Sequence, residues 1–446
     1  MTQGVSRVRT GKSRFRIFSL VALLSLLAAA CLGGEGGGTA EGTEGGGGGG
    51  SVEIMGAFLD DEAEGFRTAL QPLIDEGVDV TYSPTPDFDT LITTRVQGGD
   101  VPDIALFPQP GLLLDVADQT DSPPVSEYLD AQELEDSLIP GFLDSATNAD
   151  GDVMGFPMRM AVKSALWYPK PAFEDAGYEI PETQEDLKAL EQQIRDDGNT
   201  PWCLGMESGD ATGWVGTDWV EEYMLRLHGP EVYDQWVSHD VLFDSPEVRA
   251  AFEGFGEVWQ TEGNVVGGAQ GLLSIAADAS TAGLFEDPPQ CFLHRQGNFA
   301  TAFFPEDVQE NLDENVGVAY FPEDTSGYDG RPVLAGGDLA LLLNDTPAAR
   351  QTMEFLAQEE FGEPWAEIGG WLSPHTGFDA SLYPTEVERD LFQIGAEADV
   401  LRFDASDLMP GAVGAGSFWT SIVDWVGGQS DLDQVLQGID QSWPSQ

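Results

Sequence analysis

The sequence predicts an α/β protein built from two parts. From residue 51 onward, short apolar segments alternate with amphipathic segments of helical period, which is the rhythm of βαβ units. Residues 51–446 are enough for two or three domains. All 11 tryptophans lie between Trp167 and Trp443, and none lies in residues 51–160, which sets the second part of the chain apart.

Hydrophobic periodicity and the positions of glycines predict the first helices and strands. Residues 51–58, "SVEIMGAF", form a short apolar segment that predicts a strand. Residues 61–77 have helical periodicity and end at a glycine, and residues 78–83, "VDVTYS", predict the next strand. Residues 87–109 predict a helix, a Gly-Gly-Asp turn and the strand "DIALF". This order predicts parallel strands whose carboxyl ends carry ligand contacts.

Later elements are marked by caps and turns. Residues 150–177 predict a turn, extended segments and a short helix that ends at a glycine, and residues 182–198 predict an amphipathic helix with acids first. Residues 245–263 predict a helix with Ser245 as N-cap and Pro246 in its first turn. A buried strand, a helix and a closing helical region are predicted over residues 333–344, 346–360 and 417–443.

The N-terminus predicts export and lipidation. Residues 1–16 carry five basic residues and no acid, and residues 17–30 are apolar but too short to span a bilayer, so residues 1–30 are predicted to be a signal peptide. "LAAAC" resembles a bacterial lipobox, which implies lipidation at Cys31, although an ordinary cleaved signal with an incidental cysteine is the alternative. Residues 31–50 predict a flexible, glycine-rich tether with a reach of roughly 25 Å.

The formal net charge is −59, with 78 Asp and Glu against 19 Lys and Arg. Nucleic acid and anionic lipid headgroups are therefore poor partners. Lysine is scarce, and an acid excess of this kind suggests adaptation of the surface to salt. If Cys31 is lipidated outside the cytoplasm, Cys203 and Cys291 remain to form a disulfide; two buried free thiols are the alternative.

Catalytic and metal-binding signatures do not emerge. "NADGD" at residues 148–152 fails the calcium-loop register and predicts a tight turn. The four histidines lack metal spacing, and no phosphate loop or nucleophile elbow is present. We therefore expect no enzymatic activity, no cofactor and no metal. A surface glycoside hydrolase stays open as an alternative, because so many acids allow any pair to be nominated.

One stretch, "GFPMRMAVKSALWYPKPAFEDAGYEIPETQEDLKALEQQI", resembles the extracellular solute-binding proteins (family 1) of carbohydrate ABC importers. The likeness continues through "TPWCLGMESGDATGWVGTDWVEEYMLR", "CFLHRQGNFATAFFP" and "GSFWTSIVDWV" and extends over residues 51–446. The middle blocks are similar to the maltodextrin- and α-glucoside-binding branch. The resemblance implies a periplasmic-binding-protein type II fold, with two α/β lobes, a hinge and a ligand cleft between the lobes.

The same resemblance implies the lobe boundaries and the role. Residues 51–160 plus 320–370 are expected to form the N-terminal lobe, and residues 161–319 plus 371–446 the C-terminal lobe. The chain would capture a mono- or oligosaccharide by hinge closure and deliver it to ABC permease subunits. We expect a monomer on the extracytoplasmic face of the membrane, held by its lipid anchor only. A protein that binds a cationic ligand such as a polyamine is a further alternative.

Sugar rings need flat apolar faces and planar polar groups, so twelve residues are candidates. By the family motifs, Phe299 stands where a tryptophan platform is frequent, and Trp419 matches a stacking residue at a helix start. Each candidate has a structural alternative in the core or in an ordinary ion pair. The candidates are Phe107, Arg159, Lys163, Trp214, Asp218, Trp219, Arg295, Phe299, Gly337, Asp338, Trp371 and Trp419.

Overall fold

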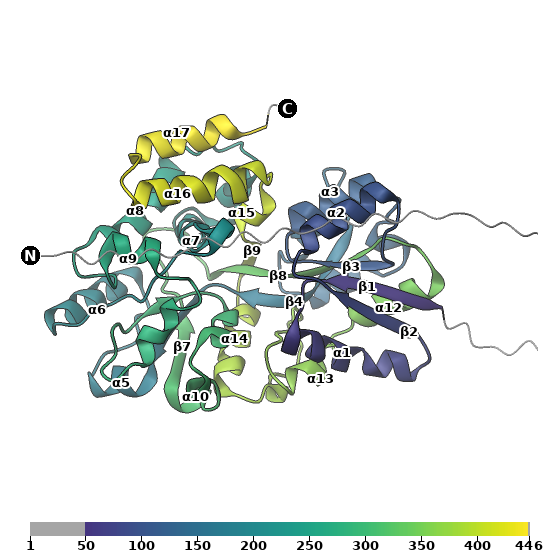
Figure 1. Cartoon of the computed structure of the whole chain (residues 1–446), viewed down its shortest axis with the longest axis horizontal. Helices are drawn as coiled ribbons and strands as arrows, with labels where there is room; N and C mark the ends of the chain where they lie inside the picture. The colour runs from purple at the N-terminus through teal and green to yellow at the C-terminus, as the bar shows by residue number, and fades with distance from the viewer. Residues whose placement is uncertain (1–49, 445–446) are drawn as a thin grey trace, which may run out of the picture. The chain divides into compact units, whose positions relative to one another are not determined.

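The computed structural model describes residues 50–444; the predicted signal peptide, Cys31 and nearly all of the predicted tether lie outside them. Two β-sheets organise the described chain, each with its own helices (Figure 1). This is the expected mixture of helices and strands. Within residues 50–444, no helix has the length and apolar character needed to cross a bilayer.

The larger sheet has six strands in the order β2-β1-β3-β8-β4, with β9 also paired to β8. β1 runs parallel to β2 and to β3, as the βαβ rhythm predicts, whereas β8 runs antiparallel to β3 and β4. Local periodicity does not reveal the direction of a strand that returns from another sheet. The strands are β1 (Ser51–Gly56), β2 (Asp79–Pro84), β3 (Ile104–Phe107), β4 (Gly155–Val162), β8 (Pro332–Leu342) and β9 (Val400–Phe403).

Helices from two separate stretches of the chain, residues 60–137 and 347–396, accompany this sheet, in purple to blue and in light green in Figure 1. Their apolar faces join the strands in one large cluster of buried side chains, which also contains residues from 372–403. The expected lobe boundaries stay a prediction. The helices are α1 (Asp60–Asp75), α2 (Phe88–Gly98), α3 (Pro110–Gln119), α4 (Ala131–Ser137), α12 (Pro347–Leu356), α13 (Glu363–Ala366) and α14 (Glu386–Ala396).

The smaller sheet has three antiparallel strands in the order β6-β5-β7. Its strands are β5 (Ala165–Pro169), β6 (His294–Arg295) and β7 (Val316–Tyr320). The helices near it, or near the second buried cluster, are α5 (Lys170–Asp175), α6 (Gln184–Asp196), α7 (Trp214–Val237), α8 (Pro246–Gln260), α9 (Gly268–Ser274), α10 (Glu306–Gln309), α11 (Leu312–Asn315), α15 (Ala405–Leu408), α16 (Trp419–Val426) and α17 (Leu432–Ser442).

Helix starts agree with the capping signals. Thr183 forms a capping box with Asp186 at the start of α6, and the Ser245 hydroxyl accepts a hydrogen bond from Val248 N at the start of α8. The closing region is two helices, because Gly428 adopts a φ of 71° after α16 and Asp431 caps α17. Capping is local, which is why it can be read from sequence.

Three connections lead between the larger sheet and either the smaller sheet or the helices of the second buried cluster, and we call them the lobe crossings. They are residues 163–164 between β4 and β5, residues 321–331 between β7 and β8, and Asp404 between β9 and α15. Strand β8 begins where the two buried clusters meet: Val333 and Ala335 pack in the larger cluster, and Leu334 between them packs in the other. The alternation of side chains along a strand therefore lets β8 serve both cores.

Candidate functional site

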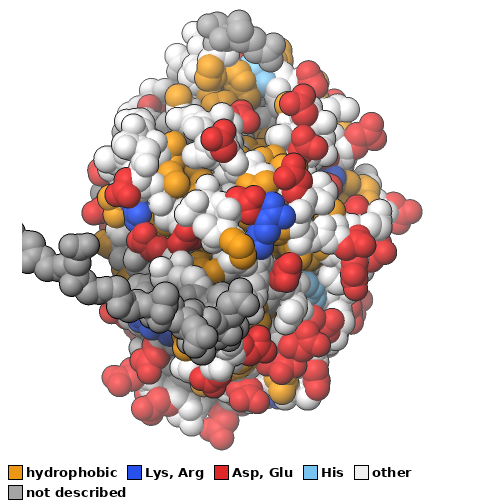
Figure 2. Space-filling view, turned by 90° about the vertical axis from the view of Figure 1, so that its right-hand side faces the viewer, with side chains coloured by type: hydrophobic (Ala, Val, Ile, Leu, Met, Phe, Trp, Pro, Cys, Tyr) orange, Lys and Arg blue, Asp and Glu red, His pale blue; other side chains and the backbone are white. Residues whose placement is uncertain are grey.

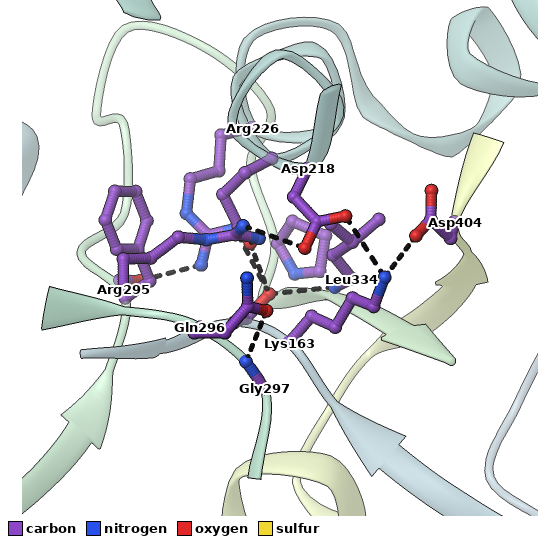
Figure 3. A network of polar contacts seen from close by, with 12 residues as sticks. Lys163, Asp218, Arg226, Arg295, Gln296, Gly297, Leu334 and Asp404 are labelled. Atoms are coloured by element: carbon purple, nitrogen blue, oxygen red, sulfur yellow. Dashed lines mark hydrogen bonds and ion pairs between the residues drawn. The ribbon is translucent and has the colours of Figure 1, made fainter. Parts of the chain in front are cut away.

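Lys163 lies in the first lobe crossing, directly after β4. Its backbone N–H donates to Leu334 O at 2.8 Å, which ties this crossing to the start of β8. Its ammonium lies 3.1 Å from Asp218 Oδ1 of α7 and also contacts Asp404 Oδ2 (Figure 3). One cation thus joins two lobe crossings to the first part of α7, which is broken further on at Gly229.

A stripe of charged residues on α7 continues the network. Glu222 accepts hydrogen bonds from Arg226, four residues further along the helix, and from Arg295 of β6. The Ser164 hydroxyl donates to Glu222 Oε1 at 2.8 Å, and Arg295 Nη1 lies 3.8 Å from Asp218 Oδ2. The side chains of Arg226 and Arg295 are buried. We give the name crossing cluster to the charged residues Lys163, Asp218, Glu221, Glu222, Arg226, Arg295 and Asp404.

The pKa values of the cluster follow from burial and neighbouring charge. Burial would lower the pKa of Lys163, but Asp218 and Asp404 together raise it above its ordinary value. Burial raises the pKa of Asp218 to about 7, although Lys163 opposes the shift. Burial would also raise the pKa of Asp404, but the Lys163 ammonium holds it below its usual range. Asp404 is therefore the ionised partner of Lys163.

Oxygen atoms of Asp218, Glu221 and Asp404 lie within 4.8 Å of one another, close enough for shared coordination of a cation. The ammonium of Lys163 already contacts two of these three carboxylates. The chain thus supplies its own cation at this position.

Two aromatic rings lie beside the crossing cluster. The ring centroids of Trp214, at the start of α7, and Phe299 are 6.1 Å apart. Lys163 Nζ lies 5.9 Å from the centroid of the Trp214 ring. Both rings are partly exposed, unlike most aromatic residues of this part of the chain. These two predicted platforms and Lys163 therefore come together.

A hollow of about 660 Å³ opens between the helices that follow β2 and β3 and the C-terminal region. α2 and α3 form one wall, and α15, the π-helical turn at Ala412–Phe418 and the start of α16 form the other. Figure 1 shows α2 and α3 on the right, facing α15 and α16 on the left. The lining residues are Asp89, Thr93, Gln109, Gly111, Leu112, Leu114, Asp115, Ser406, Asp407, Leu408, Met409, Pro410, Gly411, Ala415 and Trp419.

Polar atoms around this hollow have unused hydrogen-bonding capacity. Gln109 Oε1 and Trp419 Nε1 are buried atoms without a hydrogen-bond partner among residues 50–444. Burial and the nearby Asp404 raise the pKa of Asp407 well above its ordinary value. Because Asp404 binds Lys163, Asp407 links the hollow electrostatically to the crossing cluster. A ligand here could stack on Trp419 and exchange hydrogen bonds with several acceptors.

Arg159 and Asp338 form a second polar group, on β4 and β8. Arg159 Nη2 lies 2.7 Å from Glu62 Oε1, and Arg159 Nε lies 3.5 Å from Asp338 Oδ2. The guanidinium also lies 5.0 Å from the centre of the Phe58 ring. Burial raises the pKa of Asp338 to about 6. A Cβ at Gly337 would lie 2.3 Å from Arg159 O, so this glycine allows the two strands to approach.

Three of the candidate residues lie in the core. Phe107 packs edge-to-face against Phe88 at 5.2 Å and is fully buried. Trp219 is buried between Trp202 and Phe255. Trp371 is 1% exposed, and its indole N–H donates to Met158 O. These three side chains therefore do not join the rings of Trp214 and Phe299.

Sequence reasoning did not single out Glu221, Glu222, Asp404, Asp407 and Gln109. A signal for the first two was available: charged residues recur every three or four positions along an otherwise apolar helix, at Asp218, Glu221 or Glu222, and Arg226. Asp404 directly follows β9, Asp407 lies in the short helix α15 that comes next, and Gln109 lies two residues after β3. Polar residues just beyond a buried strand are frequent at ligand sites.

The predicted disulfide is confirmed. Cys203 and Cys291 are bridged, with Cα atoms 5.4 Å apart, and both are buried. Cys203 also accepts a hydrogen bond from His294 Nδ1 through its carbonyl oxygen, at 2.8 Å. The bridge therefore lies next to the strand that carries Arg295. The turn predicted at residues 148–152 is also present: Asn148 Oδ1 accepts from the backbone of Asp150 and Asp152.

Residues 61–362 match the family model described as "Bacterial extracellular solute-binding protein". This match spans more than half of the chain. The chain belongs to the family of bacterial extracellular solute-binding proteins. The family resemblance predicted from the sequence motifs is confirmed, and the family consists of transport proteins that bind a solute.

Two curated members of this solute-binding family are similar over most of their length. The osmoprotective compounds-binding protein GgtB of Synechocystis sp. is 45% identical over 88% of this chain and 92% of its own. The alpha-glucosides-binding periplasmic protein AglE of Rhizobium meliloti is 38% identical over 89% of this chain and 87% of its own. The alignments therefore extend well beyond a single lobe or motif.

Solved structures of solute-binding proteins show the same fold. The bacterial solute receptor AcbH, described with a preference for β-D-galactopyranose, has a TM-score of 0.71, with 17% identity over 88% of this chain and 96% of that one. The raffinose complex of RafE has a TM-score of 0.62, with 16% identity over 88% of this chain and 98% of that one. The predicted periplasmic-binding-protein fold is therefore confirmed.

Proposed function

We propose that this chain is the extracellular substrate-binding component of an ABC sugar importer. It captures a mono- or oligosaccharide of α-glucoside type between two lobes and delivers it to the permease subunits. The identity of 38% with an alpha-glucosides-binding protein over nearly the whole chain supports this substrate class. The hollow, with Trp419 on one wall and helices α2 and α3 on the other, is the geometric observation that carries the proposal.

The proposed ligand contacts divide the twelve candidates by their exposure. Trp419, Trp214 and Phe299 offer partly exposed ring faces on which sugar C–H groups can stack. Lys163, Asp218 and Arg295 are engaged with one another and with Glu222, so we assign them to positioning the aromatic rings rather than to direct hydrogen bonds with a sugar. Arg159 of β4 and Asp338 of β8 are proposed to contribute polar contacts to the ligand.

Hinge closure is proposed to take place about the lobe crossings. Two of these connections, at Lys163 and at Asp404, are joined by the ammonium of Lys163. The residue ranges expected for the two lobes stay part of this proposal. Closure would bring the two walls of the hollow together around the sugar, because residues from both walls line it.

Anchoring is also a proposal. Residues 1–30 would be removed, Cys31 would carry lipid, and residues 31–50 would act as a leash on the outer face of the cell membrane. A monomer at the membrane could then reorient onto the importer. Expression of a Cys31→Ala variant in a bacterium tests the anchor: the protein should leave the membrane fraction, and unchanged membrane retention would contradict lipidation.

Binding of sugars by the full-length chain tests the main proposal. We expect maltose, trehalose or sucrose to raise the melting temperature and to change the tryptophan fluorescence, because Trp214 and Trp419 are partly exposed. Cleavage of the sugar should not accompany binding. A shift with polyamines or peptides and with none of the sugars would overturn the substrate class.

A further inference from the structure

Carboxyl groups line the hollow from both sides. Asp89 of α2 and Asp115 of α3 line one wall, and Asp407 of α15 lines the other. Among the described residues that line the hollow, none is Lys, Arg or His. Burial and the nearby Asp404 already disfavour ionisation of Asp407, so a further negative charge placed here meets the same desolvation and repulsion.

The cations nearest to this region are committed to carboxylates of the chain. Lys163 contacts Asp218 and Asp404, and Arg295 contacts Glu222. The outer surface adds to the negative field: Figure 2 shows Asp and Glu spread over one face, with few Lys and Arg among them. At a formal net charge of −59, the chain also repels anions before they reach the hollow.

From this arrangement we propose that the hollow selects neutral, hydroxyl-rich sugars and rejects acidic sugars of the same size. The inference rests on the proposed function and adds the charge of the substrate to it. Hydroxyl groups donate hydrogen bonds to carboxylate oxygens and to Gln109 Oε1, and they can accept one from Trp419 Nε1. A sugar carboxylate would instead need a free arginine or lysine.

Selection of the neutral sugar depends on repulsion of the uronate as well as on attraction of the neutral form. A neutral sugar and its uronate differ in one CH₂OH group, so stacking and most hydroxyl contacts are common to both. A carboxylate that enters between Asp89, Asp115 and Asp407 loses its hydration without gaining a counter-charge. The acidic form is therefore expected to bind at least about tenfold more weakly.

Matched sugars measure this selectivity. Maltose, trehalose and sucrose are each compared by calorimetry with the derivative in which one CH₂OH group of a glucose ring is oxidised to a carboxylate. The full-length chain is used, at about 0.1 M salt, where the Debye length is near 10 Å. At least one neutral disaccharide should bind, and its uronate should bind at least about tenfold more weakly.

Removal of carboxylates from the wall of the hollow should reduce the difference in affinity between a neutral sugar and its uronate. Asp89 and Asp115 are exposed, so the Asp89→Asn/Asp115→Asn variant is expected to fold normally. Its preference for the neutral form should fall by about threefold or more, since two of the three lining carboxylates are gone. Asp118→Asn, an exposed change on the same helix that does not line the hollow, is the matched control and should leave the preference unchanged.

The outcomes separate the two proposals. Equal affinity for a neutral sugar and its uronate overturns the charge selection and leaves sugar binding intact. The charge selection is also overturned if Asp118→Asn reduces the preference for the neutral sugar as much as Asp89→Asn/Asp115→Asn does. If a uronate binds and no neutral disaccharide does, the charge selection is wrong. If neither kind binds, the proposed function fails, and this inference fails with it.

Discussion

Replacement of Lys163 by methionine tests the crossing cluster most directly. Lys163→Met keeps most of the side-chain volume and removes the ammonium that contacts Asp218 and Asp404. Both carboxylates are buried, at 1% and 3% exposed, so they would be left without this counter-charge. Removal of one member of a buried ion pair costs about 3–5 kcal/mol. We expect a loss of that size near pH 7.

The loss should depend on pH with a defined sign. In the native protein the pKa of Asp404 lies below its ordinary value, so its contribution is present above the unfolded pKa and is lost as pH falls. Without Lys163, burial raises the folded pKa of Asp404, and stability is then lost as pH rises through the acid range. The difference in unfolding free energy between the native protein and the variant should therefore be larger at about pH 7 than at about pH 5.

Urea unfolding at these two pH values measures the difference. Lys188→Met is the matched control: Lys188 lies 2.6 Å from Glu257, but both side chains are more than 60% exposed, so its loss should cost at most about 1 kcal/mol. Adding Asp404→Asn to Lys163→Met should restore about 1 kcal/mol or more, because the orphaned charge is removed. Equal costs for Lys163→Met and Lys188→Met would refute the reasoning.

Three further outcomes are expected. Trp419→Ala should weaken sugar binding about tenfold, measured by calorimetry, with little change in melting temperature. Trp219→Ala, in the core, should instead cost about 3–5 kcal/mol of stability in urea unfolding. Equal losses of stability in the two variants would contradict the placement of the two side chains. Cys203→Ala/Cys291→Ala should cost about 2–5 kcal/mol of stability. Reductant is expected to lower the melting temperature of the native protein and to leave that of the double variant unchanged, and equal responses of the two would contradict a stabilising bridge. Burial lowers the pKa of His294 to about 4, so stability should fall as pH drops from about 6.5 towards 4. In urea unfolding, His294→Gln should make the unfolding free energy depend less on pH in this range. The same dependence on pH in the variant would contradict a role for His294.

Most of the secondary structure could be predicted because its signals are local. A capping residue, a helical period and a terminal glycine act within one element, and α8 begins directly after Ser245, the predicted N-cap. The antiparallel direction of β8 could not be predicted in this way. It depends on a return from the smaller sheet across a lobe crossing, which no local pattern encodes.

The candidate site was harder to predict because residue type does not reveal direction. Trp214 and Trp219 were treated alike, yet five residues on a helix turn the second ring about 140° away from the first. Asp218, four residues after Trp214, shares its face and does meet Lys163. Helical period alone could therefore have placed Trp219 in the core. Asp404, from a distant crossing, could be paired with Lys163 only in three dimensions.

The position of the crossing cluster is informative because cations are so scarce in this chain. With 19 Lys and Arg against 78 Asp and Glu, three cations are nevertheless buried together as Lys163, Arg226 and Arg295. Apolar side chains of similar volume would often stabilise a core as well or better. An apolar patch lacks directional contacts of this kind. Lys163 donates to Asp218 of α7 and to Asp404 of another crossing. Ser164 donates to Glu222 of α7 and accepts from Leu334 N of β8, so the crossings, α7 and β8 are held in one register. A two-lobed binding protein needs that register at the point where its lobes meet, since both walls of the hollow are positioned from there.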